Sequence, residues 1–215
     1  NILEILSSGL KWSSKKNSKQ EVYDKCVKII EEVGLSKEDL ERYPSDFSGG
    51  QRQRISIARA LLMEPEILIC DEVVSALDVS IQGQILNLLQ DIRNKRNLSM
   101  IFIAHDLKVA CYFCDRIGVM YKGELMEEAN AKDLYEKALH PYTQLLFSSV
   151  PNKNEKLNFE KENFENKNLK TEIDKIKIEG CPFAPRCEKA TEKCFAEKPE
   201  LKSISENHKI SCHNF

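Results

Sequence analysis

Two short apolar runs in this sequence each end in residues that can do metal or acid-base chemistry. Residues 67–70 lead directly into Asp71 and Glu72, and residues 100–104 lead into His105. A carboxylate at the end of a buried parallel strand can hold Mg²⁺, and the next carboxylate can polarise an attacking water. A histidine there can hydrogen-bond a phosphate. Asp71 and Glu72 are therefore candidates for a Mg²⁺ ligand and a group that activates water, whereas His105 by itself is weak evidence for a function.

A third element lies upstream, where Ser48, Gly49, Gly50 and Gln51 precede a helical pattern. Free N–H groups and the helix dipole favour an anion at such a helix start, and the glycines allow close approach of a phosphate. Each feature alone has a plainer explanation: a loop, a strand end paired with Lys or Arg, or an ordinary histidine. Their order and spacing together favour a phosphate site.

The elements that must position these residues alternate between helix and strand. Apolar spacing predicts helices, and continuous apolar runs predict parallel strands buried on both faces. Ser80 is the expected N-cap of the helix between the two strands. The predicted helices are 20–34, 51–63, 81–95, 107–114 and 131–138, the parallel strands are 67–70 and 100–104, and a hairpin joins 116–120 to 124–126. This order predicts an α/β layered domain with a mostly parallel sheet.

Composition narrows the class of protein. With 215 residues, 41% of them hydrophobic, the chain can bury a core, and its formal charge of −2 argues against nucleic acid as a partner. No apolar run reaches the ~18 residues that a membrane helix requires, and residues 1–10 do not have the pattern of a signal peptide. We therefore expect a soluble, cytosolic chain.

Four segments of the sequence together resemble the conserved motifs of ABC-transporter ATPases. Residues 47–51 resemble the signature motif, 67–72 the Walker B strand, 75–78 the D-loop and 101–106 the switch-histidine segment. The resemblance implies a P-loop NTPase-type fold with a helical subdomain, and ATP and Mg²⁺ as ligands. Phe47 and Val73 depart from the residues that the family usually has, leucine and proline, without removing a reacting group.

The resemblance also assigns roles to single residues. It implies that Asp71 holds Mg²⁺, Glu72 activates water and His105 contacts the γ-phosphate. It further implies that the signature residues contact ATP held by a second ATPase subunit, with Asp78 along the seam between the two subunits; the signature residues are Ser48, Gly49, Gly50 and Gln51. A head-to-tail dimer follows, and a paralogue is the preferred partner.

No Gly-x-x-x-x-Gly-Lys-Ser/Thr motif occurs in the sequence, which begins at Asn1 without an initiator methionine. The P-loop supplies the backbone cradle and the lysine that bind the nucleotide. We therefore expect the chain to be the C-terminal part of a longer protein and to be inactive as an isolated fragment.

The last part of the chain carries four cysteines, Cys181, Cys187, Cys194 and Cys212, in the spacing Cys-x5-Cys-x6-Cys-x17-Cys. In a reducing compartment such a group indicates metal ligands, and thiolates suit zinc or an iron-sulfur cluster. Reduced cysteines in a packed tail, with His208 or His213 as bystanders, are the alternative. Cys111 and Cys114 fall on an amphipathic helix and are interpreted as packing residues.

Residues 180–187 of this tail, together with residues 140–146 earlier in the chain, resemble the C-terminal extension of oligopeptide and dipeptide importer ATPases, a branch that also includes nickel and glutathione importers. The resemblance implies a 4Fe-4S cluster at the four cysteines, with zinc as the alternative. It also implies two transmembrane permease subunits, an extracytoplasmic substrate-binding protein and a location at the cytoplasmic face of the membrane.

The predicted domains are a helical subdomain (1–47), truncated at its N-terminal side, the C-terminal part of an ABC ATPase core (48–151), a Lys/Glu/Asn-rich linker (152–179) and the cysteine-containing extension (180–215). The predicted function is the ATP-hydrolysing subunit of a peptide importer. Two other classes stay open: a soluble ABC ATPase without membrane subunits, and a noncatalytic metal-binding module.

Overall fold

Two units make up the chain, Asn1–Asp106 and Leu107–Phe215, in a computed structural model that describes residues 1–10, 18–148 and 179–215. The predicted linker lies outside the described residues except for Glu179. The division into four domains therefore stays a prediction.

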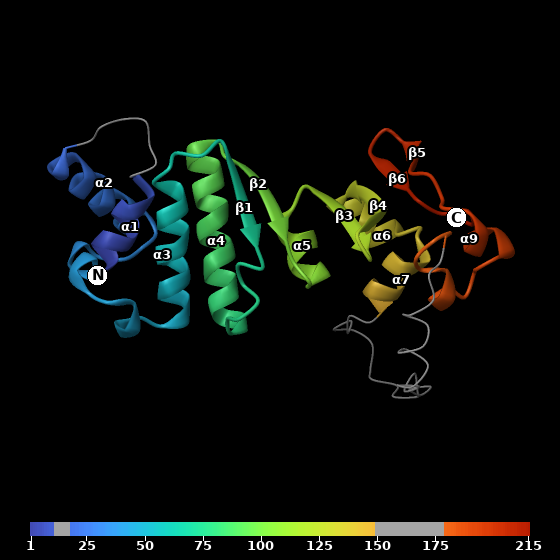
Figure 1. Ribbon diagram of the computed structural model, residues 1–215, viewed down its shortest axis with the longest axis horizontal. Helices are drawn as coiled ribbons and strands as arrows, with labels where there is room; N and C mark the ends of the chain where they lie inside the picture. Colours follow the sequence, from blue (N-terminus) through green and yellow to red (C-terminus); the bar gives the residue numbers. More distant parts are fainter. Residues whose placement is uncertain (11–17, 149–178) are drawn as a thin grey trace. The chain divides into compact units, whose positions relative to one another are not determined.

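The first unit combines a helical layer with a pair of parallel strands (Figure 1). Its elements are α1 (Ile2–Leu10), α2 (Lys19–Glu32), the 3-10 turns η1 (Lys37–Glu41) and η2 (Pro44–Asp46), α3 (Gly49–Leu61), β1 (Ile67–Asp71), α4 (Val79–Arg96) and β2 (Ser99–Ile103). Arg96 joins three of the helices: its guanidinium donates to the Glu32 carboxylate at 2.9 and 2.5 Å and to the Leu61 carbonyl at 3.3 Å. This two-pronged pair fixes α2 against the ends of α3 and α4.

The helix start before α4 differs from the prediction. The N-cap of α4 is Asp78, two residues before Ser80, and its side chain makes no capping hydrogen bond. Asp and Ser are almost equally good N-caps, so the sequence could not separate the two positions. The side chain of Asp78 is exposed as a result.

The parallel pairing of β1 with β2 is confirmed, and its register runs from Ile67 opposite Ser99 to Asp71 opposite Ile103. Burial alternates along β1: Leu68 and Cys70 are buried, whereas Ile67 and Ile69 are exposed. The helices of this unit lie on one side of the strand pair in Figure 1. The expected burial on both faces is therefore not seen among the described residues, because only one face of the pair is covered.

The second unit is built on an antiparallel sheet with the strand order β3-β4-β6-β5. Its elements are α5 (Leu107–Phe113), β3 (Arg116–Tyr121), β4 (Glu124–Asn130), α6 (Ala131–Lys137), α7 (Pro141–Ser148), η3 (Ala184–Arg186), α9 (Glu192–Ala196), β5 (Lys202–Ser205) and β6 (His208–Ile210). The predicted hairpin is confirmed, with Lys122 and Gly123 at positive φ in its two-residue turn.

Strands β5 and β6 were not predicted from the sequence, because they are short and mostly polar. Strand β6 pairs with β4, with Ile210 opposite Glu127, and β5 pairs with the other edge of β6, so the cysteine-containing extension is part of the same sheet as the hairpin. Within the described ranges, no helix has both the length and the apolar character of a membrane span.

Candidate functional site

The parallel pairing brings the three candidate reactive residues to one end of the strand pair. Asp71 ends β1 directly opposite Ile103, the last residue of β2. Glu72 and His105 follow these strand ends, and His105 Nδ1 lies 4.0 Å from Glu72 Oε1. Both side chains are more than half exposed, so they face open space in which a ligand can bind.

Glu72 has an unusual backbone conformation that aims its side chain. Its φ is 47°, in the left-handed region that costs a residue with a Cβ about 1–2 kcal/mol. Its N–H donates to the Ile103 carbonyl at 3.0 Å, and its carbonyl accepts from the N–H and the hydroxyl of Ser75 at 3.0 and 2.9 Å. These three hydrogen bonds hold the strained residue in place, as is typical of functional sites.

Ser48 and Gln51 cap each other at the start of α3. The Ser48 hydroxyl accepts from the Gln51 N–H at 3.3 Å, and the Gln51 side-chain oxygen accepts from the Ser48 N–H at 3.0 Å. Both side chains are thereby used within the turn. The groups that this turn offers to an anion are the N–H groups of Gly49 and Gly50, which have no carbonyl partner within the helix.

The same turn packs against the segment that follows β1. A Cβ at Gly49 would lie 3.5 Å from Leu77 Cδ2, whereas a Cβ at Gly50 would lie 2.6 Å from Ile81 Cγ2. The turn formed by residues 48–51, here called the signature turn, therefore lies beside Leu77 and the first turn of α4. The contact with Ile81 leaves no space for a side chain at Gly50.

This contact predicts different outcomes for two adjacent substitutions. Gly50→Ala should destabilise the first unit by about 1–3 kcal/mol, since Ile81 is β-branched and cannot rotate its methyl away. Gly49→Ala meets only ordinary contact and should change stability by less than about 0.5 kcal/mol. Urea unfolding of the two variants checks this, and equal stabilities would contradict it.

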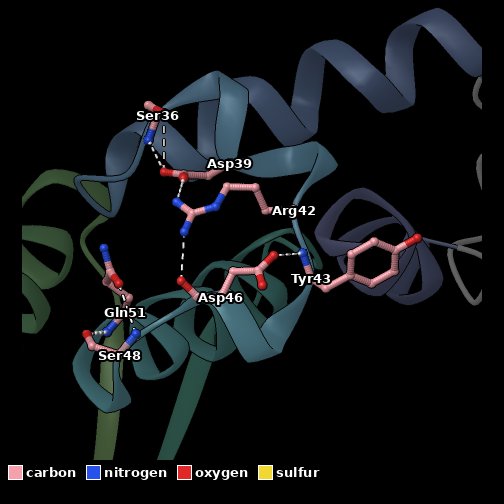
Figure 2. Close-up of polar contacts among 7 residues, drawn as sticks. All are labelled: Ser36, Asp39, Arg42, Tyr43, Asp46, Ser48 and Gln51. Carbon is pink, nitrogen blue, oxygen red and sulfur yellow. Dashed lines mark hydrogen bonds and ion pairs between the residues drawn. The ribbon is translucent and has the colours of Figure 1, made fainter.

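An ion-pair network that the sequence analysis did not identify shapes the chain ahead of Ser48 (Figure 2). Arg42 lies between Asp39, at 2.7 Å, and the Asp46 carbonyl, also at 2.7 Å. The guanidinium stacks over the Phe47 ring at 4.5 Å from its centroid, and the Tyr43 N–H donates to the Asp46 carboxylate at 3.0 Å. The signal in the sequence was the i, i+3 spacing of Ser36, Asp39 and Arg42, which is typical of helix caps and ion pairs.

The network also sets the charge of Asp39. Burial by itself would raise the pKa of this carboxyl, but the Ser36 N–H, the Arg42 guanidinium and the Ser36 hydroxyl outweigh burial and lower the pKa. Asp39 therefore stays ionised, and its contribution to stability is lost only as the pH falls through that lowered value.

The four tail cysteines are brought together around one small cavity. Its lining comprises Cys181, Cys187, Cys194 and Cys212 with His140, Pro141, Phe183, Ala184, Lys189, His213 and Asn214. All four cysteines are free thiols. Sequence spacing alone placed them in one segment, and the fold places them at one point.

Burial raises the pKa of the Cys181, Cys187 and Cys212 thiols, and neighbouring sulfurs add to the effect. Hydrogen bonds from backbone N–H groups lower the pKa of the same thiols. The donors are Phe183 and Ala184 for Cys181, Lys189 for Cys187, and Asn214 for Cys212. N–H groups aimed at sulfur favour the thiolate, the form that binds metal. The donor set therefore fits a metal group that four thiolates ligate.

Gly180 makes the close approach of two of these cysteines possible. It is buried, and a Cβ there would lie 2.3 Å from the Cys194 carbonyl oxygen and 2.7 Å from the backbone of Phe195. Next to it, the Cys181 N–H donates to the Cys194 carbonyl at 2.8 Å. The sequence contained this glycine, but only the fold shows why a side chain is excluded.

Gly180→Ala should therefore destabilise the extension by about 1–3 kcal/mol, because the clash is with backbone and not with a movable side chain. Gly83→Ala is the control: nothing lies within 4 Å of its position in α4, and alanine should stabilise this helix by up to about 1 kcal/mol. Hydrogen exchange of residues 179–215 measures the difference. Unchanged protection in the Gly180 variant would contradict the prediction.

The extension is attached to the hairpin by aromatic rings and one buried carboxylate. Phe183 contacts Tyr121 and Tyr142, with ring centroids 5.4 and 5.2 Å apart. Glu127, fully buried on β4, accepts from the Leu139 N–H at 2.8 Å, from the His140 N–H at 3.1 Å and from His208 Nε2 at 2.7 Å. Sequence reasoning missed Glu127, because an isolated glutamate in a polar strand carries no signal of burial.

The remaining histidines and cysteines of this unit have structural positions. His213 Nε2 lies 3.0 Å from the Glu197 carbonyl, and the buried His140 accepts from the Tyr142 N–H at 3.0 Å. Burial lowers the pKa of His140, so its ring is neutral. Cys111 and Cys114 pack against the apolar core of this unit, which confirms the interpretation of that pair.

This combination of a parallel strand pair with an acidic end, a capped Ser-Gly-Gly turn and a cysteine-containing extension matches two known families. The family model described as "ABC transporter" matches residues 5–75, and the one described as "Oligopeptide/dipeptide transporter, C-terminal region" matches residues 126–194. The chain belongs to the ABC transporter ATPase family and carries the C-terminal region of the oligopeptide/dipeptide branch.

Curated relatives point to the same branch. The oligopeptide transport ATP-binding protein AppF of Bacillus subtilis is 44% identical over 88% of this chain and 57% of its own length. OppF of Haemophilus influenzae, another oligopeptide transport ATP-binding protein, is 44% identical over 99% of this chain and 64% of its own length. The dipeptide transport ATP-binding protein DppF of the same organism is 42% identical over 92% of this chain and 59% of its own length. The chain thus spans about three fifths of the length of these relatives.

Solved structures confirm the predicted fold class. MJ1267, an ATP-binding cassette of an ABC transporter, aligns with a TM-score of 0.57 at 21% sequence identity. The alignment covers 67% of this chain and 62% of the MJ1267 chain. The chain of cbiO1 from Clostridium perfringens has a TM-score of 0.56 at 27% identity, with 64% and 53% covered. The α/β class is therefore confirmed, although the larger sheet among the described residues is antiparallel.

Proposed function

We propose that this chain is the catalytic and signature-bearing part of the ATP-binding subunit of an ABC importer for oligopeptides or dipeptides. The observation that carries the proposal is the placement of Asp71, Glu72 and His105 at one end of a parallel strand pair, with Glu72 and His105 4.0 Å apart. The printed functions of the relatives support the class of cargo, peptides.

Each residue has a distinct role in this proposal. Asp71 holds Mg²⁺, Glu72 orients and polarises the attacking water, and His105 donates a hydrogen bond to the γ-phosphate. His105 Nδ1 and Glu72 Oε1, 4.0 Å apart, are close enough for one water or phosphate oxygen beside them to hydrogen-bond both. Because the side chains of Glu72 and His105 are exposed, a nucleotide can bind against them and be covered by a second ATPase subunit.

The signature turn acts on a second ATPase subunit. The N–H groups of Gly49 and Gly50 bind the γ-phosphate of ATP held in the P-loop of that subunit, with Ser48 and Gln51 fixing the turn. Asp78, exposed at the N-cap of α4 beside this turn, lies along the seam and couples the two sites. The second subunit is a paralogue, and the pair drives two transmembrane permeases at the cytoplasmic face of the membrane, where a substrate-binding protein delivers peptide from outside.

The four-cysteine cavity holds a 4Fe-4S cluster in this proposal. A single zinc ion, with Zn–S bonds of about 2.3 Å, requires its sulfurs within about 4 Å of one another. In the described ranges no group of three or more His, Cys, Asp or Glu side chains is arranged to hold one ion. Four cysteine thiolates that line one cavity are the donor set that an iron-sulfur cluster would use.

The test is purification of the tagged polypeptide from membranes of its source cells. Two permease subunits and a second ATPase subunit should co-purify, and the assembly should hydrolyse ATP in a peptide- and binding-protein-dependent way. Ribosomes or DNA in place of permeases would contradict the proposal and indicate a soluble ABC ATPase. Equal amounts of bound iron and sulfide would support the cluster, whereas bound zinc without iron would contradict it and indicate a zinc site.

A further inference from the structure

One uncharged residue at the cysteine cavity, Asn214, is within hydrogen-bond distance of two of the four cysteine sulfurs. Asn214 lies two residues after Cys212 and lines the cavity. Its backbone N–H donates to Cys212 Sγ at 3.4 Å. Its side-chain nitrogen contacts Cys194 Sγ at 3.5 Å and the Lys189 carbonyl at 2.8 Å.

These contacts use both kinds of donor that Asn214 has, its backbone N–H and its side-chain NH₂ group. A carboxamide nitrogen carries two hydrogens, and the two are directed to different acceptors, a sulfur and a carbonyl. The Lys189 carbonyl belongs to the turn after Cys187, in which the Ala190 N–H donates to the Cys187 carbonyl at 3.1 Å. Asn214 thereby links the segments that carry Cys187, Cys194 and Cys212.

We propose that Asn214 is a positioning residue for the cysteine site, which fixes the segments of Cys187, Cys194 and Cys212 and stabilises negative charge on the Cys194 and Cys212 sulfurs. The inference rests on the proposed iron-sulfur assignment. Hydrogen bonds to sulfur stabilise the reduced, more negative form of a cluster and therefore raise its reduction potential. Thr191, whose hydroxyl lies 3.4 Å from Cys194 Sγ, supports the same sulfur from the start of α9.

The chain offers a matched control in the same extension. Asn207 lies in the exposed turn between β5 and β6 and is absent from the lining of the cavity. Asn207→Asp makes the same chemical change as Asn214→Asp without touching a sulfur. Asn214→Ala removes the two side-chain donors without adding charge, and it keeps the backbone N–H to Cys212.

The experiment is anaerobic reconstitution of the full polypeptide with iron and sulfide, followed by a redox titration monitored by electron paramagnetic resonance. Asn214→Ala should shift the midpoint potential to a more negative value, Asn214→Asp should shift it further, and Asn207→Asp should leave it unchanged. Iron uptake lost from both Asn214 variants but kept in Asn207→Asp would also support the positioning role.

Two results overturn the inference, and they are distinguishable. A wild-type chain that takes up zinc or no metal in place of a cluster would overturn the iron-sulfur assignment together with the role of Asn214. A wild-type cluster whose potential and iron content are the same in both Asn214 variants would overturn the role of Asn214 alone.

Discussion

Glu72→Gln is expected to lower the rate of ATP hydrolysis by about 10²–10⁴-fold, the usual contribution of a positioned general base. The amide keeps the shape of the side chain and loses the charge that polarises water. The hydrogen bonds of residue 72 with Ile103 and Ser75 use its main-chain groups, so the strained backbone conformation should survive the substitution. ATP binding should therefore persist while turnover is lost.

The measurement must be made on an assembly that includes a P-loop, since none occurs in residues 1–215. Steady-state phosphate release and nucleotide retention are compared for wild type, Glu72→Gln and the control Glu66→Gln. Glu66 is an exposed carboxylate ahead of the opposite end of β1, so its substitution should leave turnover unchanged. A Glu72 variant that keeps more than half of the wild-type rate would show that another group activates the water.

Glu127→Ala is expected to cost about 2–5 kcal/mol, because it removes a buried hydrogen-bond acceptor and leaves two backbone N–H groups unpaired, at about 1–3 kcal/mol each. The Leu139 and His140 N–H groups would lose the carboxylate, and His208, whose side chain is 12% exposed, would lose its partner. Strand β6 would then depend on its backbone hydrogen bonds to β4, on the packing of Ile210 and on the surface pair of Lys209 with Glu128. We expect the extension to detach before the hairpin unfolds.

The adjacent Glu128→Ala provides the control. Glu128 pairs with Arg116 and, at 3.8 Å, with Lys209 near the surface, and such pairs contribute about 0–1 kcal/mol. Hydrogen exchange resolved along residues 116–130 and 202–210 should show increased exchange of β5 and β6 in the Glu127 variant and little change in the Glu128 variant. Equal behaviour of the two would mean that burial of Glu127 contributes no stability.

Most local elements, and the order of the chemical groups, follow from residue type and spacing, whereas β5, β6 and the N-cap of α4 do not. The reading of residues 67–72 as a strand with an acidic end depended on apolar residues in consecutive positions, and that of 48–51 on turn and capping chemistry. Both signals are local, so periodicity and residue type suffice to find them. The spacing of the four cysteines likewise indicated one group of ligands, because chain connectivity limits how far apart they can lie.

Which groups meet across long separations in the chain depends on the fold and cannot be read from a local pattern. The 4.0 Å approach of Glu72 to His105 follows from the register of β1 with β2, and a run of apolar residues does not specify register. The side chain excluded at Gly180, the hydrogen bonds of the buried Glu127 and the contacts of Asn214 with Lys189 and Cys194 all involve partners 12 to 81 residues away along the chain. Such contacts are set by the packing of whole elements, and no local pattern in the sequence records them.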